Sequence, residues 1–369
     1  MITNNKKTLQ EMRILYNWSE NTLKTYTSAL NDYTTYQQAT ITELIREAEQ
    51  DEENINKTSK RQIKTRLVNY RVHLQEDKQF SSNTIKMYLA MICKIYRHYD
   101  ITIPVLPPIR VTSTETFEDI PTSDEIKNAI LHSRTKNKAL ITFIASSGLR
   151  RSDVARLTID DFLEATRDQH SNTDNVLSDL QELRKQRVII PTWNIIDQKT
   201  GINHITFNSH ESSLYIIQML MERLSKEELS RDKLLFNVKP DTISKNFRNL
   251  NTKLGMGWKE HRRHFHPHAL RKYFATTLTG NDVDFLSTEF LLGHSLNRVQ
   301  SSYYFANPER LRQKYARIMN KLTFTLEVTY VDVDSRERRE LTELRRYKEE
   351  SNTRINKLEE MLNFLSKEL

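Results

Sequence analysis

The sequence predicts a mainly α-helical protein with one small β-hairpin, an α+β fold in which helices dominate. Only 6 of its 369 residues are glycine, too few for the many tight turns of an all-β or Rossmann-like fold. Apolar residues recur at helical spacing in several segments, whereas β-branched runs gather in one stretch. The length favours more than one domain. We expect a helical domain over residues 1–110, a second domain over 111–325 and an extension over 326–369.

Three amphipathic helices are expected in the first domain. Ser19 can cap the first, whose apolar positions are Leu23, Tyr26, Leu30 and Tyr33. The second covers residues 58–75, and the third begins at Ser82 or Asn83. Because three prolines within residues 101–111 cannot continue a helix, the domain boundary is placed there.

Residues 54–110 concentrate positive charge, with eleven Lys or Arg against three Asp or Glu, in a chain of net charge +8. Such an excess suggests a polyanionic partner. Two interpretations stay open: these side chains form a solvated face, or they face DNA, where each neutralised phosphate releases counterions. The local concentration favours DNA. The candidate DNA-binding residues are Lys57, Lys60, Arg61, Lys64, Arg66, Arg71 and Lys86.

Two helices and then the hairpin are expected in the second domain. One helix covers about residues 124–132, and an apolar helix over residues 139–147 ends at a glycine. Within residues 188–210, β-branched runs lie on both sides of the Lys-Thr-Gly sequence at 199–201, which predicts a hairpin. Helices return from about Asp241.

Several classes of site and location are excluded. One cysteine, Cys93, allows neither a disulfide within the chain nor a cysteine-based zinc site, and its apolar neighbours indicate a core position. Four histidines lack the partners of a metal site, so no metal or other cofactor is expected: His261, His264, His266 and His268. The first ten residues lack the apolar run of a signal peptide, and no apolar stretch reaches membrane length. We expect a cytoplasmic protein with no membrane partner.

Four segments contain residue types that suit phosphate chemistry. Arg150 lies in SSGLRRSDVARL, and Lys199 lies in the predicted hairpin turn. In HPHALRKYF, His268 and Arg271 are three residues apart and share a helix face. In LLGHSLNRVQSSYYF, a tyrosine follows His294 by nine residues. Each segment alone has an ordinary explanation as a helix end, a solvated turn or a packing residue.

Taken in this order, the four segments resemble the catalytic domain of the tyrosine recombinase family, over roughly residues 120–320. The hairpin and YYFANPERLRQKY are most similar to integrases of archaeal mobile elements. The resemblance implies a two-domain, C-shaped clamp around double-stranded DNA. It implies site-specific recombination through a covalent 3′-phosphotyrosine without metal or ATP, carried out by a homo-oligomer, typically a tetramer on paired sites. The expected source is a prokaryote, a virus or a mobile element.

The family's motifs assign roles to individual residues. Arg150 matches the first catalytic arginine, with Asp153 as its acidic support. Lys199 matches the hairpin lysine. The remaining matches are the H-x-x-R pair, the position held by His or Trp, and the nucleophile: His268, Arg271, His294 and Tyr303. Tyr304 directly follows the nucleophile and is its close rival.

The chemistry explains these residue types. Two arginines can hold the nonbridging oxygens of a phosphodiester and stabilise the charge of its five-coordinate transition state. Tyrosine supplies the nucleophilic oxygen, His268 can act as its base, and a lysine on a turn can protonate the leaving 5′ oxygen. His294 can hydrogen-bond the phosphate. The phosphotyrosine retains the bond energy, so rejoining needs no ATP.

Three other functions stay open. A type IB topoisomerase uses a similar residue set, but the helical first domain and the spacing from GHS to the tyrosine favour a recombinase. A DNA-binding regulator of the same fold would have lost activity, yet all six catalytic positions are filled. A coiled-coil structural protein is suggested only by the last forty residues, a tenth of the chain.

The C-terminal extension has a heptad pattern from residue 341 to residue 369, with polar breaks at Lys348 and Ser351. We expect a coiled-coil-like helix. It pairs between subunits, or it folds back on its own catalytic domain, or it is frayed in solution.

Overall fold

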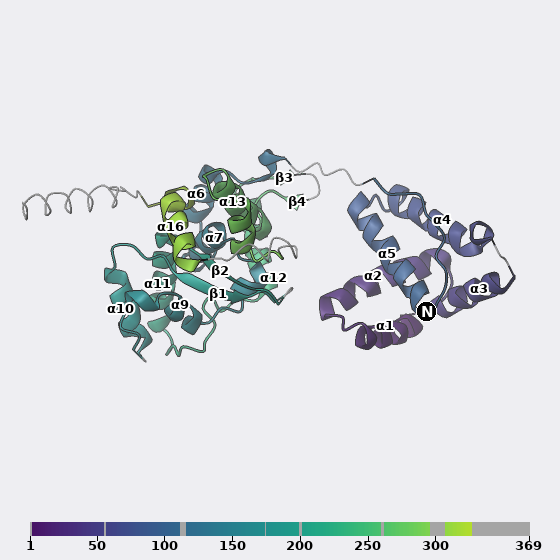
Figure 1. The fold of residues 1–369 in the computed structure, drawn as a ribbon, viewed down its shortest axis with the longest axis horizontal. Coiled ribbons are helices and arrows are strands. Elements are labelled where there is room, and N and C mark those ends of the chain that lie inside the picture. Colours follow the sequence, from purple (N-terminus) through teal and green to yellow (C-terminus); the bar gives the residue numbers. More distant parts are fainter. Residues whose placement is uncertain are drawn as a thin grey trace, which may run out of the picture. The chain divides into compact units, whose positions relative to one another are not determined.

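A computed structural model of the chain describes residues 2–54, 57–110, 116–173, 175–198, 201–259, 262–295 and 307–326. Its contacts divide the chain into two compact units, residues 1–114 and 115–369, each described by itself below. The structure is mainly helical with two short two-stranded sheets, which confirms the predicted fold class (Figure 1). The heptad segment, Lys199 and Tyr303 lie outside the described residues.

The first unit is a bundle of five α-helices: α1 Ile2–Leu15, α2 Glu20–Gln37, α3 Ile41–Asn54, α4 Gln62–Glu76 and α5 Ser82–His98, with a 3₁₀ turn η1 Thr58–Lys60. Ser19 caps α2 by accepting from the Thr22 N–H at 3.2 Å, as expected. Helices α1 and α3 escaped the sequence analysis. Their faces are buried only against neighbouring helices, because α1 packs on α2 and α3 packs on α4.

Three tyrosines lie at the centre of this bundle, and their hydroxyl groups are hydrogen-bonded. The Tyr33 and Tyr96 hydroxyls are 3.0 Å apart, and the Tyr70 hydroxyl donates to the Asp32 carboxylate at 2.9 Å. Buried hydroxyls need such partners, because a missing hydrogen bond would leave the full cost of desolvation. Burial raises the pKa of Tyr96 to about 12. Cys93 is buried in the same core, as predicted.

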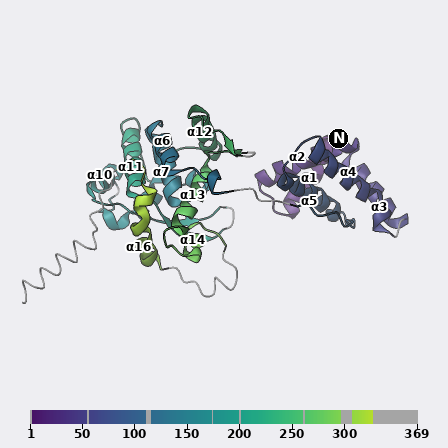
Figure 2. The ribbon, with the colours of Figure 1, turned by 90° about the horizontal axis from the view of Figure 1, so that it is seen from above.

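The second unit is built around α7. Its helices are α6 Ser123–Leu131, α7 Thr135–Ser147, α8 Arg151–Val154, α9 Ile159–Ala165, α10 Val176–Lys185, α11 His210–Leu224, α12 Pro240–Lys253, α13 Pro267–Thr279, α14 Phe285–Leu291 and α16 Pro308–Ile318; its 3₁₀ turns are η2 Phe117–Asp119, η3 Arg167–Gln169 and η4 Met319–Leu322. Both views show α7 inside the unit, among α6, α11 and α13 (Figures 1 and 2). From Ala139 to Ser147 every residue of α7 is buried, which explains why this stretch is mostly apolar and has no charged residue.

The two sheets are hairpins. Strands β1 Thr192–Ile196 and β2 Asn203–Phe207 pair antiparallel, from Thr192 opposite Phe207 to Ile196 opposite Asn203. This is the hairpin that the β-branched runs predicted. A shorter pair, β3 Trp258–Lys259 with β4 Arg262–Arg263, precedes α13. Its two-residue strands are too short for a period-two pattern, so the sequence analysis missed them.

A buried carboxylate holds residues 324–326, the last described part of the chain. Glu211, in the first turn of α11, accepts the N–H groups of Phe324 and Thr325 at 2.7 Å each and that of Leu326 at 3.2 Å. It also accepts from the Thr325 hydroxyl, which lies 2.9 Å from the Tyr215 hydroxyl. The charge of Glu211 is thus balanced by N–H dipoles. The chain that follows α16 is held on the same unit as α11.

We predict that Glu211→Gln lowers the free energy of unfolding of the second unit by about 2–3 kcal/mol. The amide keeps one acceptor oxygen but turns an NH₂ donor toward backbone donors. Urea denaturation followed by circular dichroism measures the change. Glu222→Gln, an exposed position on the same helix, should change stability by less than about 0.5 kcal/mol. Equal stability of the two variants would refute this account of the anchor.

Candidate functional site

A pocket of about 620 Å³ in the second unit collects positively charged side chains from α8, α12, the β3–β4 hairpin and α13. Within the described part of the chain, no Asp or Glu lines it. Its arginines and histidines are Arg150, Arg151, Arg248, Arg262, Arg263, Arg271, His266 and His268. A pocket of this composition suits an anion such as a phosphate diester. Three of the predicted site residues therefore line one pocket: Arg150, His268 and Arg271.

Arg150 occupies the N-cap position of α8, immediately after the turn that ends α7. Gly148 makes this turn with φ of +67°, and a Cβ there would lie 2.3 Å from Cδ1 of Phe274. Both facts require glycine, because a side chain would be strained and would collide with α13. The Arg150 guanidinium, partly exposed to the pocket, pairs with the buried carboxylate of Asp197 at the end of β1.

Asp153, predicted to support Arg150, donates its backbone N–H to the Arg150 carbonyl at 2.9 Å, while its carboxylate binds other groups. Its Oδ1 accepts from Nη2 of Arg156 at 2.9 Å and from the backbone N–H of Gln198 at 3.3 Å. Asp153 thus ties α8 to the turn of the β1–β2 hairpin, while the Asp197 carboxylate pairs with the Arg150 guanidinium. The sequence analysis missed Asp197. The one available signal was its position two residues before Lys199.

Arg271 is buried and joins three parts of the site. Its Nη1 donates to the Gly148 carbonyl at 2.7 Å, and its Nη2 donates to the Leu292 carbonyl at 2.6 Å. The same Nη2 lies 2.8 Å from Nε2 of His294. Burial lowers the pKa of Arg271 to about 10, and the positive charge of Arg150 acts in the same direction. Arg271 therefore remains a cation at neutral pH.

His294 follows a glycine that approaches the β1–β2 hairpin closely. Gly293 has φ of +65°, and a Cβ there would lie 2.5 Å from Cε1 of His204 on β2. His204 is buried, and burial lowers its pKa to about 4, so its ring is neutral at neutral pH. On the opposite side, Nδ1 of His294 lies 2.9 Å from Oε2 of Glu289 on α14. The sequence analysis missed both His204 and Glu289.

His268 is exposed at the start of α13 and lines the pocket beside Arg271. Desolvation by neighbouring groups lowers the pKa of the His268 imidazole to about 4, and the cations of Lys272 and Arg271 act in the same direction. The ring is unprotonated at neutral pH, which is the form that a general base requires.

Lys199 and Tyr303 lie outside the described residues, but the chain on both sides of each is anchored. Arg156 donates to the Ile196 carbonyl and Asp153 accepts from the Gln198 N–H, so both hold the chain just before Lys199. The segment with Tyr303 runs between His294 and Asn307, which caps α16. Within α16, the Tyr315 hydroxyl donates to the carbonyl of Ser146 on α7 at 2.7 Å.

The candidate DNA-binding side chains of the first unit fall into two groups. Lys57, Lys60 and Lys86 are exposed, and Lys64 is half-buried. The arginines are instead held by the protein. Arg61 pairs with Glu52. Arg66 binds both carboxylate oxygens of Glu47, at 2.8 and 2.5 Å.

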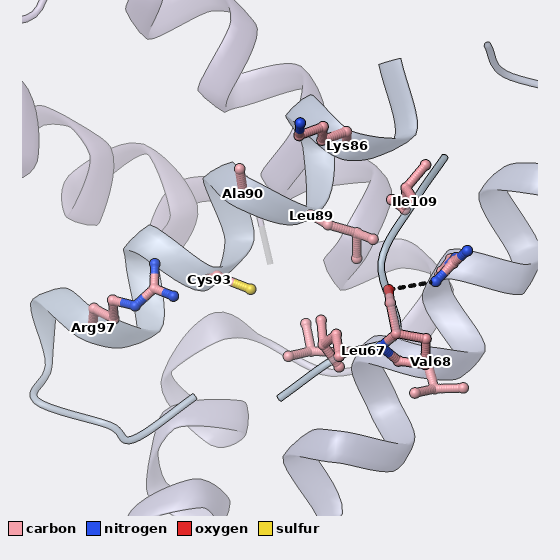
Figure 3. A pocket seen from close by; sticks show the side chains of 11 residues that line it. Leu67, Val68, Lys86, Leu89, Ala90, Cys93, Arg97 and Ile109 are labelled. Carbon is pink, nitrogen blue, oxygen red and sulfur yellow. Dashed lines mark hydrogen bonds between the residues drawn. The ribbon is translucent and has the colours of Figure 1, made fainter. Parts of the chain in front are cut away.

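The third candidate arginine, Arg71, donates to the Pro107 carbonyl at 2.8 Å and fastens the segment after α5. Arg71 and Lys86 both line an apolar pocket of about 240 Å³ between α4, α5 and that segment. Figure 3 shows the Lys86 side chain near the N-terminal end of α5 and the Cys93 sulfur farther along the same helix.

Among the described residues there is no cluster of three or more His, Cys, Asp or Glu side chains placed to hold a metal ion. None of the described helices is long and apolar enough to cross a membrane.

Comparison with known proteins gives consistent results. Tyrosine recombinase XerA of Saccharolobus solfataricus is 24% identical over 246 residues, which cover 66% of this chain and 71% of that protein. The structure is similar to that of XerH bound to a palindromic difH substrate in a post-cleavage complex, with a TM-score of 0.52, 15% identity, and coverage of 85% of this chain and 83% of that one.

A second solved structure, a lambda integrase (75–356) dimer bound to a COC′ core site, has a TM-score of 0.51 and 14% identity. The alignment covers 81% of this chain and 94% of that one. At these identities the solved structures show a shared fold. The phage integrase family model matches residues 121–310, which is more than half of the chain and contains the whole arginine-lined pocket. The chain therefore belongs to the phage integrase family.

Proposed function

We propose that this chain is a site-specific DNA recombinase that cuts and rejoins DNA strands through a covalent bond between Tyr303 and a 3′ phosphate. The observation that supports this most directly is the pocket shared by Arg150, Arg271 and His268. The relatives point the same way, since the XerH and lambda integrase structures hold DNA substrates. The enzyme then acts where DNA is accessible, in the cytoplasm or nucleoid of a prokaryote or the host of a mobile element.

The two arginines divide the work of holding the phosphate. Arg150 is partly exposed, so it can reach a nonbridging oxygen while Asp197 holds its other side. Arg271 is buried and fixed by two carbonyl groups, so its charge needs no reorganisation when the five-coordinate transition state forms. Losing one such donor typically costs about 3–4 kcal/mol of transition-state stabilisation.

Proton transfer completes the reaction. His268 takes the proton of the Tyr303 hydroxyl, whose oxygen attacks the phosphorus, and Lys199 gives a proton to the departing 5′ oxygen. In rejoining, a 5′ hydroxyl attacks the phosphotyrosine and the same groups act in reverse. Asp153 supports Lys199 and Arg150 indirectly, by holding the turn of the β1–β2 hairpin against α8.

We predict that Tyr303→Phe abolishes covalent attachment to DNA and leaves binding nearly unchanged, because it removes the nucleophilic oxygen alone. A nicked duplex that traps the covalent complex, followed by peptide mapping, measures this. An adduct on Tyr304 or Tyr315 would move the nucleophile. Absence of any adduct would favour a DNA-binding regulator. Supercoil relaxation without exchange between two sites would favour a topoisomerase.

We also propose that the lysines of the first unit bind the DNA backbone. Replacing Lys57, Lys60 and Lys86 together by Gln should weaken binding to many sequences and flatten the slope of log K against log salt by about 2–3. Binding is measured by fluorescence anisotropy between about 50 and 300 mM salt, a range in which counterion release makes affinity depend steeply on salt concentration. Arg66→Gln, which breaks an internal ion pair, is the control and should leave the slope unchanged. Equal slopes for the triple variant and the wild type would mean that these lysines face away from DNA.

We propose, finally, that recombination requires a tetramer on paired sites and that the heptad segment contributes to its assembly. A chain that ends at Asp334 retains the Glu211 anchor. It should cleave a single site normally but self-associate more weakly and recombine two sites poorly. Sedimentation with and without DNA, together with a two-site assay, measures both effects. If the two forms associate and recombine alike, the heptad segment does not contribute to assembly.

A further inference from the structure

Glu289, His294 and Arg271 form a chain of polar contacts that ends in the phosphate-binding pocket. Oε2 of Glu289 lies 2.9 Å from Nδ1 of His294, and Nε2 of the same ring lies 2.8 Å from Nη2 of Arg271. The backbone joins the first two residues as well, because the His294 N–H donates to the Glu289 carbonyl at 3.0 Å. This bond closes the turn at Gly293 and keeps the ring of His294 close to the Glu289 carboxylate.

The two partners of His294 determine which ring nitrogen carries the proton. A carboxylate can only accept a hydrogen bond, so Nδ1 must donate to Glu289. A guanidinium can only donate, so Nε2 must accept from Arg271 through its lone pair. One neutral tautomer satisfies both contacts, with the proton on Nδ1. The carboxylate of Glu289 is the group that selects it.

We propose that Glu289 is a positioning residue for the recombination reaction: it fixes the His294 tautomer and thereby orients the guanidinium of Arg271 toward the phosphate. This role rests on the proposed function of the site. It also differs from the expectation that His294 hydrogen-bonds the phosphate, because in this arrangement Nε2 faces a donor. His294 acts on the phosphate through Arg271.

Removing the carboxylate has a defined consequence. Without Glu289 the ring can carry its proton on Nε2, and an N–H then faces the N–H of Arg271. The guanidinium must shift to relieve this, although the carbonyls of Gly148 and Leu292 still hold it partly. Outer groups of this kind typically change activity by about 10–100-fold when they are removed.

Single-turnover cleavage of a trapping DNA substrate by the full chain tests the proposal. Glu289→Ala should slow cleavage by about 10–100-fold, with DNA affinity within about twofold. Glu289→Gln can still accept from Nδ1–H and should stay within about tenfold of the wild type. Glu222→Ala removes an exposed carboxylate from α11 and is the matched control, expected to cleave at the wild-type rate.

A double-mutant cycle separates positioning from general stability. If Glu289 acts through His294, Glu289→Ala should cause almost no further loss in a chain that already carries His294→Ala. Additive losses would overturn the proposal. A substrate with a 5′-bridging sulfur, whose leaving group needs no proton, should rescue Lys199→Ala but not Glu289→Ala. Rescue of both would assign Glu289 to the leaving-group step and overturn the positioning role.

The tautomer can be observed directly, independently of activity. In the full chain labelled with ¹⁵N-histidine, long-range ¹⁵N–¹H spectra distinguish a protonated ring nitrogen from an unprotonated one, and His294→Ala identifies the signals of that ring. The wild type should show protonated Nδ1 and bare Nε2, whereas Glu289→Ala should move proton density to Nε2. The same tautomer in both proteins would overturn the proposal.

Failure of the inference is distinguishable from failure of the proposed function. A wild-type chain that forms no DNA adduct would refute the recombinase. If the wild type cleaves and His294→Ala does not slow it, or if His294→Ala slows it and Glu289→Ala does not, the function stands and the role of Glu289 falls.

Discussion

The buried guanidinium of Arg271 is the interaction on which the rest of the catalytic unit depends. It donates to the Gly148 carbonyl at the end of α7 and to the Leu292 carbonyl after α14, and it contacts the ring of His294. Three parts of the chain therefore meet at one planar group. Burying a cation costs free energy unless its donors are satisfied, and the two carbonyl groups satisfy them without cancelling the charge. The pocket therefore keeps a net positive field for an incoming phosphate.

Two glycines make this convergence sterically feasible. Gly148 brings the end of α7 against Phe274 of α13, and Gly293 brings the turn before His294 against the ring of His204. Both adopt positive φ, so the same residue type meets a conformational need and a packing need at once. The short motifs around these glycines thus contain packing contacts as well as the candidate site residues Arg150 and His294.

Among the described residues, the acidic groups of the site contact the side chains of the pocket but do not line it. Asp197 pairs with Arg150 from the end of β1, and Asp153 binds the turn of the β1–β2 hairpin. Glu289 contacts His294 from α14. Carboxylates in these positions orient cations and rings, and none of the described residues that line the pocket is acidic. In the first unit the same principle separates exposed lysines from arginines that the fold has already paired with glutamates.

Sequence alone determined the features that depend on neighbours close along the chain. Helix caps such as Ser19, the apolar run of α7 and the β1–β2 hairpin follow from local patterns, and the ordered residues from Arg150 to Tyr303 indicated the family. Tertiary structure alone decided which charges meet. The bonds of Arg150 to Asp197 and of Arg66 to Glu47 join residues 47 and 19 positions apart. Glu289 lies near His294 in the sequence, but their side-chain contact depends on the turn at Gly293. The contact of the same ring with Arg271 depends on how α13 packs. Spacing cannot specify such partners, because the packing of separate elements determines which side chains share a buried, low-dielectric space.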